Sequence, residues 1–178
     1  MIKFFPIALL LAFCQVAPAQ NSPCRITITT DSAARVRRAQ TDFSVISNET
    51  DNLFCTAFRA GAVFSIYFGL EILNRPICFK PGSKAIIIFT DNSQAQLVNE
   101  QGENCKGNFL VNTSVNDKHF VEKAALFNAL TEKAIKGIRF YSTQGFIDYD
   151  VTEYDDAKSV KDAEGFRKSL ACLKDLQL

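Results

Sequence analysis

The segment from Leu53 to Ile72 constrains the fold more than any other part of this chain. It reads LFCTAFRAGAVFSIYFGLEI. Apolar side chains recur at every second position of its latter half, which is typical of β-strands. The positions on this apolar face are Ala62, Phe64, Ile66, Phe68 and Leu70. The small residues Ala60 and Gly61 interrupt the alternation, and they predict a tight turn between two antiparallel strands.

Similar patterns predict further strands and two helices. We expect strands at residues 24–30, 84–90 and 107–112, and a hairpin at 137–151 around a turn at 143–145. Helical spacing of apolar residues predicts helices over 118–135 and from about residue 155 to near the end of the chain. Short turns favour antiparallel pairing. The sequence therefore predicts an α+β fold, with one antiparallel sheet of several strands in meander and hairpins and two helices packed on one of its faces. A β-sandwich with added helices is the alternative.

Residues 1–19 have the pattern of a secretory signal peptide. Lys3 supplies a positive charge, an apolar run follows, and Ala17-Pro18-Ala19 is a small-x-small cleavage motif. The apolar run is shorter than the roughly 20 residues that span a bilayer. Lipid attachment at Cys14 would need small residues before the cysteine, and bulky Phe13 disfavours it. We expect cleavage after Ala19, which leaves residues 20–178 as a single globular α+β domain that is secreted or periplasmic.

The charge of the expected mature chain is balanced. The sequence has 20 Lys plus Arg and 19 Asp plus Glu, and removal of residues 1–19 takes away Lys3 and no acid. A neutral domain is a poor ligand for nucleic acid or anionic membranes, which favour a basic excess. The most basic stretch is residues 35–38, which we interpret as the solvated face of a short helix.

The cysteines indicate an oxidising compartment. Five remain after the expected cleavage, and they are too widely spaced for a CxxC redox motif or a zinc knuckle. An odd number leaves one thiol unpaired, or paired in a disulfide-linked dimer. Cys55 and Cys78 both have the parity that points away from the main aromatic face. If their strands are neighbours, these two cysteines form a disulfide.

The candidate catalytic residues centre on His119, the one histidine of the chain. Asp117 or Glu122 would orient it as a general base that activates a serine. A polar residue at the start of a helix is the simpler interpretation, because the chain contains neither a GxSxG nor an HExxH motif.

The candidate metal ligands lie in the acidic stretch DYDVTEYDD, at Asp148, Asp150 and Glu153. These carboxylates are suited to a cation such as calcium, or to paired acid and base chemistry. The spacing of an EF-hand is absent, because Glu153 stands where that loop requires glycine. The competing interpretation places Asp148 and Asp150 on the solvent side of a strand.

These features together favour a small exported disulfide-containing domain that acts as a non-enzymatic binding or accessory module. Its partner would be a protein or a small ligand of the envelope or extracellular space, and no cofactor is expected. The alternative is a secreted hydrolase that uses His119 or an acidic pair.

Overall fold

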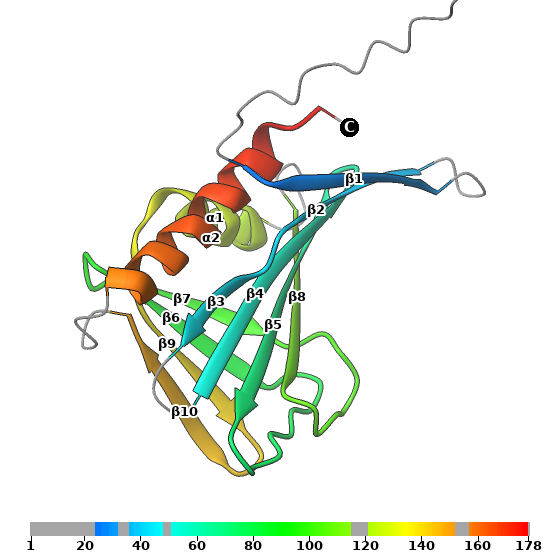
Figure 1. Cartoon of the computed structure of the whole chain (residues 1–178). Coiled ribbons are helices and arrows are strands. Elements are labelled where there is room, and N and C mark those ends of the chain that lie inside the picture. Colours follow the sequence, from blue (N-terminus) through cyan, green and yellow to red (C-terminus); the bar gives the residue numbers. More distant parts are fainter. Residues whose placement is uncertain (1–23, 32–35, 48–50, 115–120, 152–156, 178) are drawn as a thin grey trace, which may run out of the picture.

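A computed structural model describes residues 24–31, 36–47, 51–114, 121–151 and 157–177. These residues form antiparallel strands and two α-helices (Figure 1). In chain order the elements are β1 Ile26–Asp31, β2 Val36–Thr41, β3 Ser44–Ser47, β4 Asp51–Ala60, β5 Val63–Ile72, β6 Lys84–Phe89, β7 Gln94–Val98, β8 Asn108–Ser114, α1 Val121–Glu132, β9 Ile135–Ser142, β10 Gly145–Asp150 and α2 Ala157–Asp175.

The strands form two sheets. The large sheet has the order β1-β2-β4-β5-β8, with β3 also paired to β4, and the small sheet has the order β10-β9-β6-β7. The α+β class is confirmed, but the expectation of a single sheet is wrong. After β5 the chain leaves the large sheet, builds β6 and β7, and returns in β8 to pair with β5. The sandwich alternative anticipated this second sheet.

Local patterns agree closely with the elements. The turn at Gly61 joins β4 to β5, whose residues pair along their full length. Gly61 has a φ of 60°, which glycine adopts without steric cost. Four positions of the expected apolar face, Phe64, Ile66, Phe68 and Leu70, are buried in β5, whereas Ala62 lies in the turn and is exposed. The hairpin of β9 and β10 has the expected turn.

Aromatic rings fill the space between the two sheets and the helices. Phe68 of β5 lies at the centre of this core, with its ring centroid 5.6 Å from that of Phe140 in β9 and 6.0 Å from that of Phe166 in α2. Phe64, nearer the β4–β5 turn, instead packs against Phe127 of α1, at 4.3 Å. The inner face of the large sheet is therefore covered by the small sheet and by both helices.

Two disulfides are formed in the described part of the chain, between Cys24 and Cys172 and between Cys78 and Cys105. The predicted Cys55–Cys78 bond is therefore wrong. Cys55 lies on the inner face of the large sheet and is 0% exposed. Cys55 does not point away from the core, because the core covers the face of β4 that carries it, whereas Phe54 on the opposite face is only half-buried.

Backbone contacts between two loops explain the pairing of Cys78. Phe79 and Asn104 exchange N–H···O hydrogen bonds of 2.8 and 3.0 Å, and the N–H of Gly107 donates to the carbonyl of Ile77 at 2.9 Å. Gly107 has a φ of 71°, and a Cβ there would lie 2.0 Å from the carbonyl oxygen of Leu70. The close approach of Gly107 to β5 requires glycine, and the bonds to Phe79 and Ile77 hold the two cysteine-bearing loops side by side.

The disulfides agree with an oxidising compartment, because such bonds persist outside the reducing cytosol. The expected signal peptide lies outside the described residues. A covalent dimer through the odd cysteine stays a prediction, and it would require the thiol of Cys55 to leave the core.

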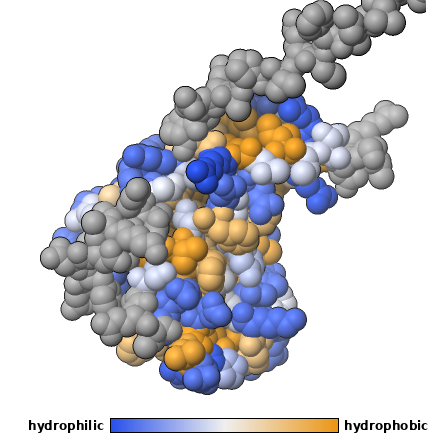
Figure 2. All heavy atoms as spheres, in the orientation of Figure 1, coloured by the Kyte–Doolittle hydropathy of each residue, from blue (hydrophilic) through white to orange (hydrophobic). Residues whose placement is uncertain are grey.

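Apolar side chains also reach the surface. Figure 2 shows apolar surface at the upper end of the molecule, where Figure 1 places β1 and the end of α2, and again at the lower end. The most exposed large apolar residues are Ile28, Val36, Phe43, Val63, Leu73, Val98, Tyr141 and Phe146. Two of these, Val36 and Val63, border the hollow described next.

Candidate binding groove

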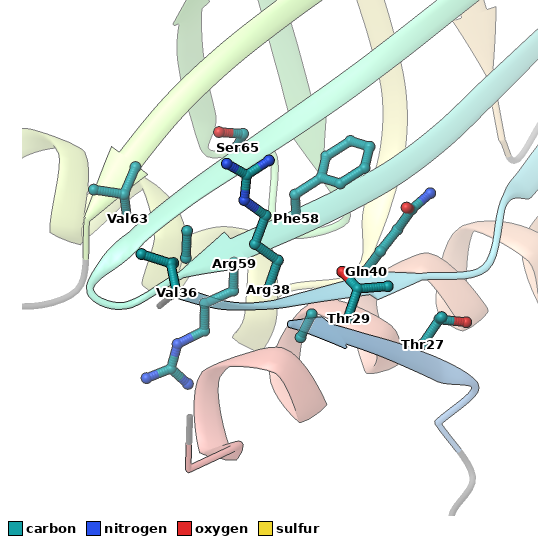
Figure 3. A pocket seen from close by; sticks show the side chains of 11 residues that line it. Thr27, Thr29, Val36, Arg38, Gln40, Phe58, Arg59, Val63 and Ser65 are labelled. Atoms are coloured by element: carbon teal, nitrogen blue, oxygen red, sulfur yellow. The ribbon is translucent and has the colours of Figure 1, made fainter. Parts of the chain in front are cut away.

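A hollow lies on the outer face of the large sheet, opposite the aromatic core (Figure 3). We call it the outer groove, and its volume is about 460 Å³. It is lined by Thr27, Thr29, Val36, Arg38, Ala39, Gln40, Phe58, Arg59, Ala60, Val63 and Ser65. This volume is within the range of small-molecule sites, which have volumes of about 300 to 1,000 Å³.

The strand registers arrange these side chains in two rows across four strands. One row runs through Thr29, Arg38, Ala60 and Val63, and the other through Thr27, Gln40, Phe58 and Ser65. Neighbouring strands lie about 4.8 Å apart and alternate residues about 7 Å apart, so the rows cover about 14 by 7 Å. The groove therefore has the footprint of one small organic molecule.

An irregularity in the edge of the sheet turns β1 and β2 away from β4. Between the pairs Gln40–Phe58 and Ser44–Cys55, the edge has three residues, 41–43, whereas β4 has only two, 56–57. The hydroxyl of Thr56 donates to the carbonyl of Thr41 at 2.9 Å, and the N–H of Ala57 donates to the hydroxyl of Thr41 at 3.0 Å. An extra residue of this kind increases strand bending, and in Figure 1 the β1–β2 hairpin extends at an angle to β4 and β5.

Two arginines, Arg38 and Arg59, are among the described lining residues, and their guanidinium groups lie in different surroundings. The guanidinium of Arg59 donates to the carbonyls of Leu173 and Lys174 at 2.7 and 3.0 Å, and also to that of Leu176. A cation at the C-terminal end of a helix stabilises the exposed carbonyls. Arg59 therefore caps α2, whereas Figure 3 shows Arg38 extending over the groove toward Phe58 and Ser65.

A chain of hydrogen bonds begins at Ser65, on the β5 side of the groove. The hydroxyl of Ser65 donates to Oδ1 of Asn112 at 2.6 Å, and the Asn112 amide donates to Glu100 at 2.7 Å. Glu100 also accepts from Lys123 at 2.8 Å. Desolvation opposes ionisation of Glu100, but the bonds from Lys123 and Asn112 outweigh it and lower the pKa of this carboxyl. The Glu100 carboxylate therefore stays ionised, and its charge is balanced by Lys123.

The predicted acidic residues Asp148 and Asp150 line a smaller hollow of about 190 Å³ on the small sheet. Both carboxylate oxygens of Asp148 accept hydrogen bonds from Arg139, at 2.6 and 2.7 Å. These bonds raise the pKa of Arg139, whose guanidinium also lies 4.6 Å from the ring centroid of Phe146. The intervening Tyr149 is buried, which agrees with the interpretation of Asp148 as the solvent side of a strand.

The other predicted site residues are not placed by the structure. His119, Asp117 and Glu153 lie outside the described residues. Within the part that is described, no group of three or more His, Cys, Asp or Glu residues is arranged to bind a metal ion.

Arg38 is a groove residue whose secondary structure differs from the one expected from the sequence. The expected short helix at residues 35–38 is wrong, because Val36 begins β2 and its residues pair with β1 and β4. The period-two signal was present: Ala39 and Thr41 are buried, whereas Arg38 is exposed. This alternation is hard to recognise in the sequence because Ala39 and Thr41 are small and Thr41 is polar.

Comparison of the chain with protein-family models, with curated proteins and with solved structures gave no significant match. Among the helices in the described ranges, neither is long and apolar enough to span a membrane.

Proposed function

We propose that this protein is an exported, non-enzymatic binding module that holds a small ligand in the outer groove. The observation that carries the proposal is the groove itself, a hollow of about 460 Å³ on an open sheet face. Its lining combines apolar side chains with a few hydrogen-bonding groups, which is the usual composition of ligand sites.

The chemistry of the lining favours binding over catalysis. Among the described residues that line the groove, the titratable groups are two guanidinium groups, and these stay protonated in proteins. The hydroxyls of Thr27, Thr29 and Ser65 and the amide of Gln40 can donate and accept hydrogen bonds. Such groups orient a ligand without exchanging protons with it at neutral pH.

A covalent tether supports the wall of the groove. The β1–β2 hairpin supplies six of the lining residues. The Cys24–Cys172 disulfide attaches the start of this hairpin to α2. A wall held by a disulfide is suited to an oxidising compartment, which agrees with the export expected from residues 1–19.

A fragment screen followed by two-dimensional amide NMR tests this proposal. We expect fragments that bind to shift amide signals of β1, β2, β4 and β5. Ala60→Trp should abolish these shifts, because Ala60 lies in the middle of one row and a large side chain there fills the groove. Leu73→Trp, at a position 71% exposed outside the groove, is the matched control.

The proposal fails if no fragment of any charge shifts the groove amides of the wild-type protein. It also fails if Ala60→Trp binds the same fragments as well as Leu73→Trp does.

A further inference from the structure

We infer that two copies of this chain pair through the free edge of β1, in an antiparallel register centred on Ile28. The pairing depends on the backbone of β1 and does not require that the outer groove binds a ligand. Three features of β1 carry this inference: its unpaired backbone groups, its lack of protecting residues and its self-complementary sequence.

The outer edge of β1 carries unpaired backbone groups. The N–H of Asp42 donates to the carbonyl of Arg25 at 3.2 Å, so position 25 directs its backbone groups toward β2. Because this direction alternates along a strand, Ile26, Ile28 and Thr30 direct theirs away from β2. β1 is the outermost strand of the large sheet, and no hydrogen bond from the described residues reaches these outward groups (Figure 1). The edge therefore offers an N–H and a C=O at each of these positions to a further strand.

This edge lacks the features that usually protect an edge strand. Proteins place lysine, proline or a β-bulge at free edges, because an unprotected edge is a template for another chain. The sequence between Arg25 and Asp31 is ITITT, which contains neither a charged residue nor a proline. All of these residues pair in register with β2, so no bulge interrupts them, and Ile28 is 44% exposed. An exposed edge of isoleucine and threonine favours pairing with a second strand.

The sequence of β1 is complementary to an antiparallel copy of itself. In a register centred on Ile28, this residue lies opposite Ile28 of the second copy, and Ile26 lies opposite Thr30. All outward backbone groups then meet, because positions of the same parity face one another. The same register places Arg25 opposite Asp31 at both ends, so opposite charges are aligned.

Other registers satisfy fewer of these groups. A shift of one residue would place outward groups opposite groups that already bond to β2. A shift of two residues separates Arg25 from Asp31 and leaves one end of each β1 strand without a partner in the other. The sequence and the backbone direction together therefore specify one register.

The symmetry of this pairing limits the assembly to two copies and brings two grooves together. Both copies use the same edge, so no edge of β1 remains for a third chain. The outer faces of the two large sheets then lie on the same side of the dimer. Thr27 and Thr29 line the outer groove, and each lies opposite the other residue of the second copy. The two grooves are therefore neighbours across the symmetry axis.

Sedimentation velocity and amide hydrogen exchange at several concentrations test the pairing. One strand from each copy makes a contact smaller than the roughly 1,600 Å² of a standard interface, so the dimer should be reversible. We expect at least half of the chains to be dimeric at about 0.5 mM and less than a tenth at about 10 µM. Exchange at Ile28 should slow as the concentration rises. Thr27 and Thr29 bond to β2, so their protection should change much less.

Engineered cysteines test the register. Ile28→Cys places two thiols at the symmetry axis, with Cα atoms about 5.5 Å apart. Thr30→Cys is the matched control, because it is exposed on the same face but its Cα atoms would be about 14 Å apart in the dimer. We expect bismaleimidoethane to cross-link Ile28→Cys at least about tenfold faster than Thr30→Cys. Cys55 is 0% exposed and should not react in the folded protein.

A charge at the symmetry axis should prevent the pairing. Ile28→Lys places two ammonium groups opposite each other and should weaken the dimer at least about tenfold. Leu73→Lys makes the same kind of change at a position 71% exposed outside β1, and it should leave the dimer within about twofold of wild type. Both positions are exposed, so both variants should fold.

Four outcomes would overturn the inference. A wild-type protein that stays monomeric at about 0.5 mM would exclude the pairing. Equal cross-linking of Ile28→Cys and Thr30→Cys would exclude the register. Equal dimerisation of Ile28→Lys and Leu73→Lys would place the contact outside β1. A wild-type dimer that disappears in Cys55→Val would be the covalent dimer through the odd cysteine and not a strand pair.

Discussion

The β1–β2 hairpin and the aromatic centre of the molecule are held in place by different means. At the centre, Phe68 contacts rings from β8, β9 and α2, so one side chain joins both sheets and a helix. The hairpin pairs with β4 at three residues, from Arg38 to Gln40, and Thr41 adds hydrogen bonds to β4 at the irregular edge. Its first strand is attached to α2 by the Cys24–Cys172 disulfide.

The two regions should therefore differ in how much variation they tolerate without loss of the fold. Burial of aromatic rings is cooperative, because each ring packs against several elements. A strand at the edge of a sheet has fewer partners and opens more easily. The groove wall is thus on the part of the molecule with fewer packing partners, and we expect its position to depend on the Cys24–Cys172 bond.

The largest expected effect is the loss of the tether. Cys24→Ser with Cys172→Ser opens a link between residues 148 positions apart. Loop entropy alone predicts a loss of about 5 kcal/mol in the free energy of unfolding. The Cys78–Cys105 link has a separation of 27 residues, and its removal should cost about 3.5 kcal/mol. Denaturant unfolding of both double variants measures the difference.

Amide hydrogen exchange sharpens this first prediction. In the variant without Cys24 and Cys172, β1 and β2 should exchange faster than β4 and β5. Equal protection of all four strands would show that packing holds the hairpin in place without the disulfide.

Removal of the central ring should have the next largest effect. Phe68→Ala should lower the free energy of unfolding by about 4 kcal/mol, because it leaves a cavity that several elements line. Protection should fall in both sheets together. Phe146→Ala, at a ring 60% exposed on the small sheet, is the control and should cost less than about 1 kcal/mol. Loss of protection in one sheet only would show that the two sheets are not coupled through Phe68.

The smallest effect concerns Cys55 and appears only at alkaline pH. Complete burial raises the pKa of this thiol, whereas an unfolded cysteine ionises near about pH 8.5. The contribution of the protonated Cys55 thiol to the free energy of unfolding is therefore fully present below that pH. It falls as the pH rises, by at most about 1.4 kcal/mol per pH unit. Burial also raises the pKa of Tyr149, which in the unfolded chain ionises near about pH 10. Between about pH 8.5 and pH 10, the change in the free energy of unfolding therefore reports on the ionisation of Cys55.

Cys55→Val tests this assignment in denaturant titrations at several pH values. The substitution keeps a small apolar side chain in the core, so its cost at neutral pH should be within about 1.5 kcal/mol. The fall in stability between about pH 8.5 and 10 should become shallower. An unchanged slope would assign the alkaline loss to another group.

Much of the local structure could be predicted from the sequence. The turn at Gly61, the buried face of β5 and the β9–β10 hairpin follow from period-two alternation and turn residues. The two expected helices correspond to α1 and α2, with shorter bounds for α1. These features depend on neighbouring residues, whose hydrogen bonds and burial repeat at short intervals.

The binding groove could not be predicted in the same way. Arg38 was assigned to a helix face, and its neighbours in the groove come from β1, β4 and β5. A residue pattern within one strand shows which side chains share a face. It does not show which other strands lie beside that face.

The sequence by itself determined the alternation of strands, the positions of the turns and the balance of charge. The tertiary structure decided that the strands divide into two sheets, that Cys78 bonds to Cys105, and that Cys55 faces the core. The physical reason is the range of the interactions. Turns and strand periodicity arise among adjacent residues, whereas sheet partners and disulfide connectivity depend on which distant segments pack together and bury the most apolar surface.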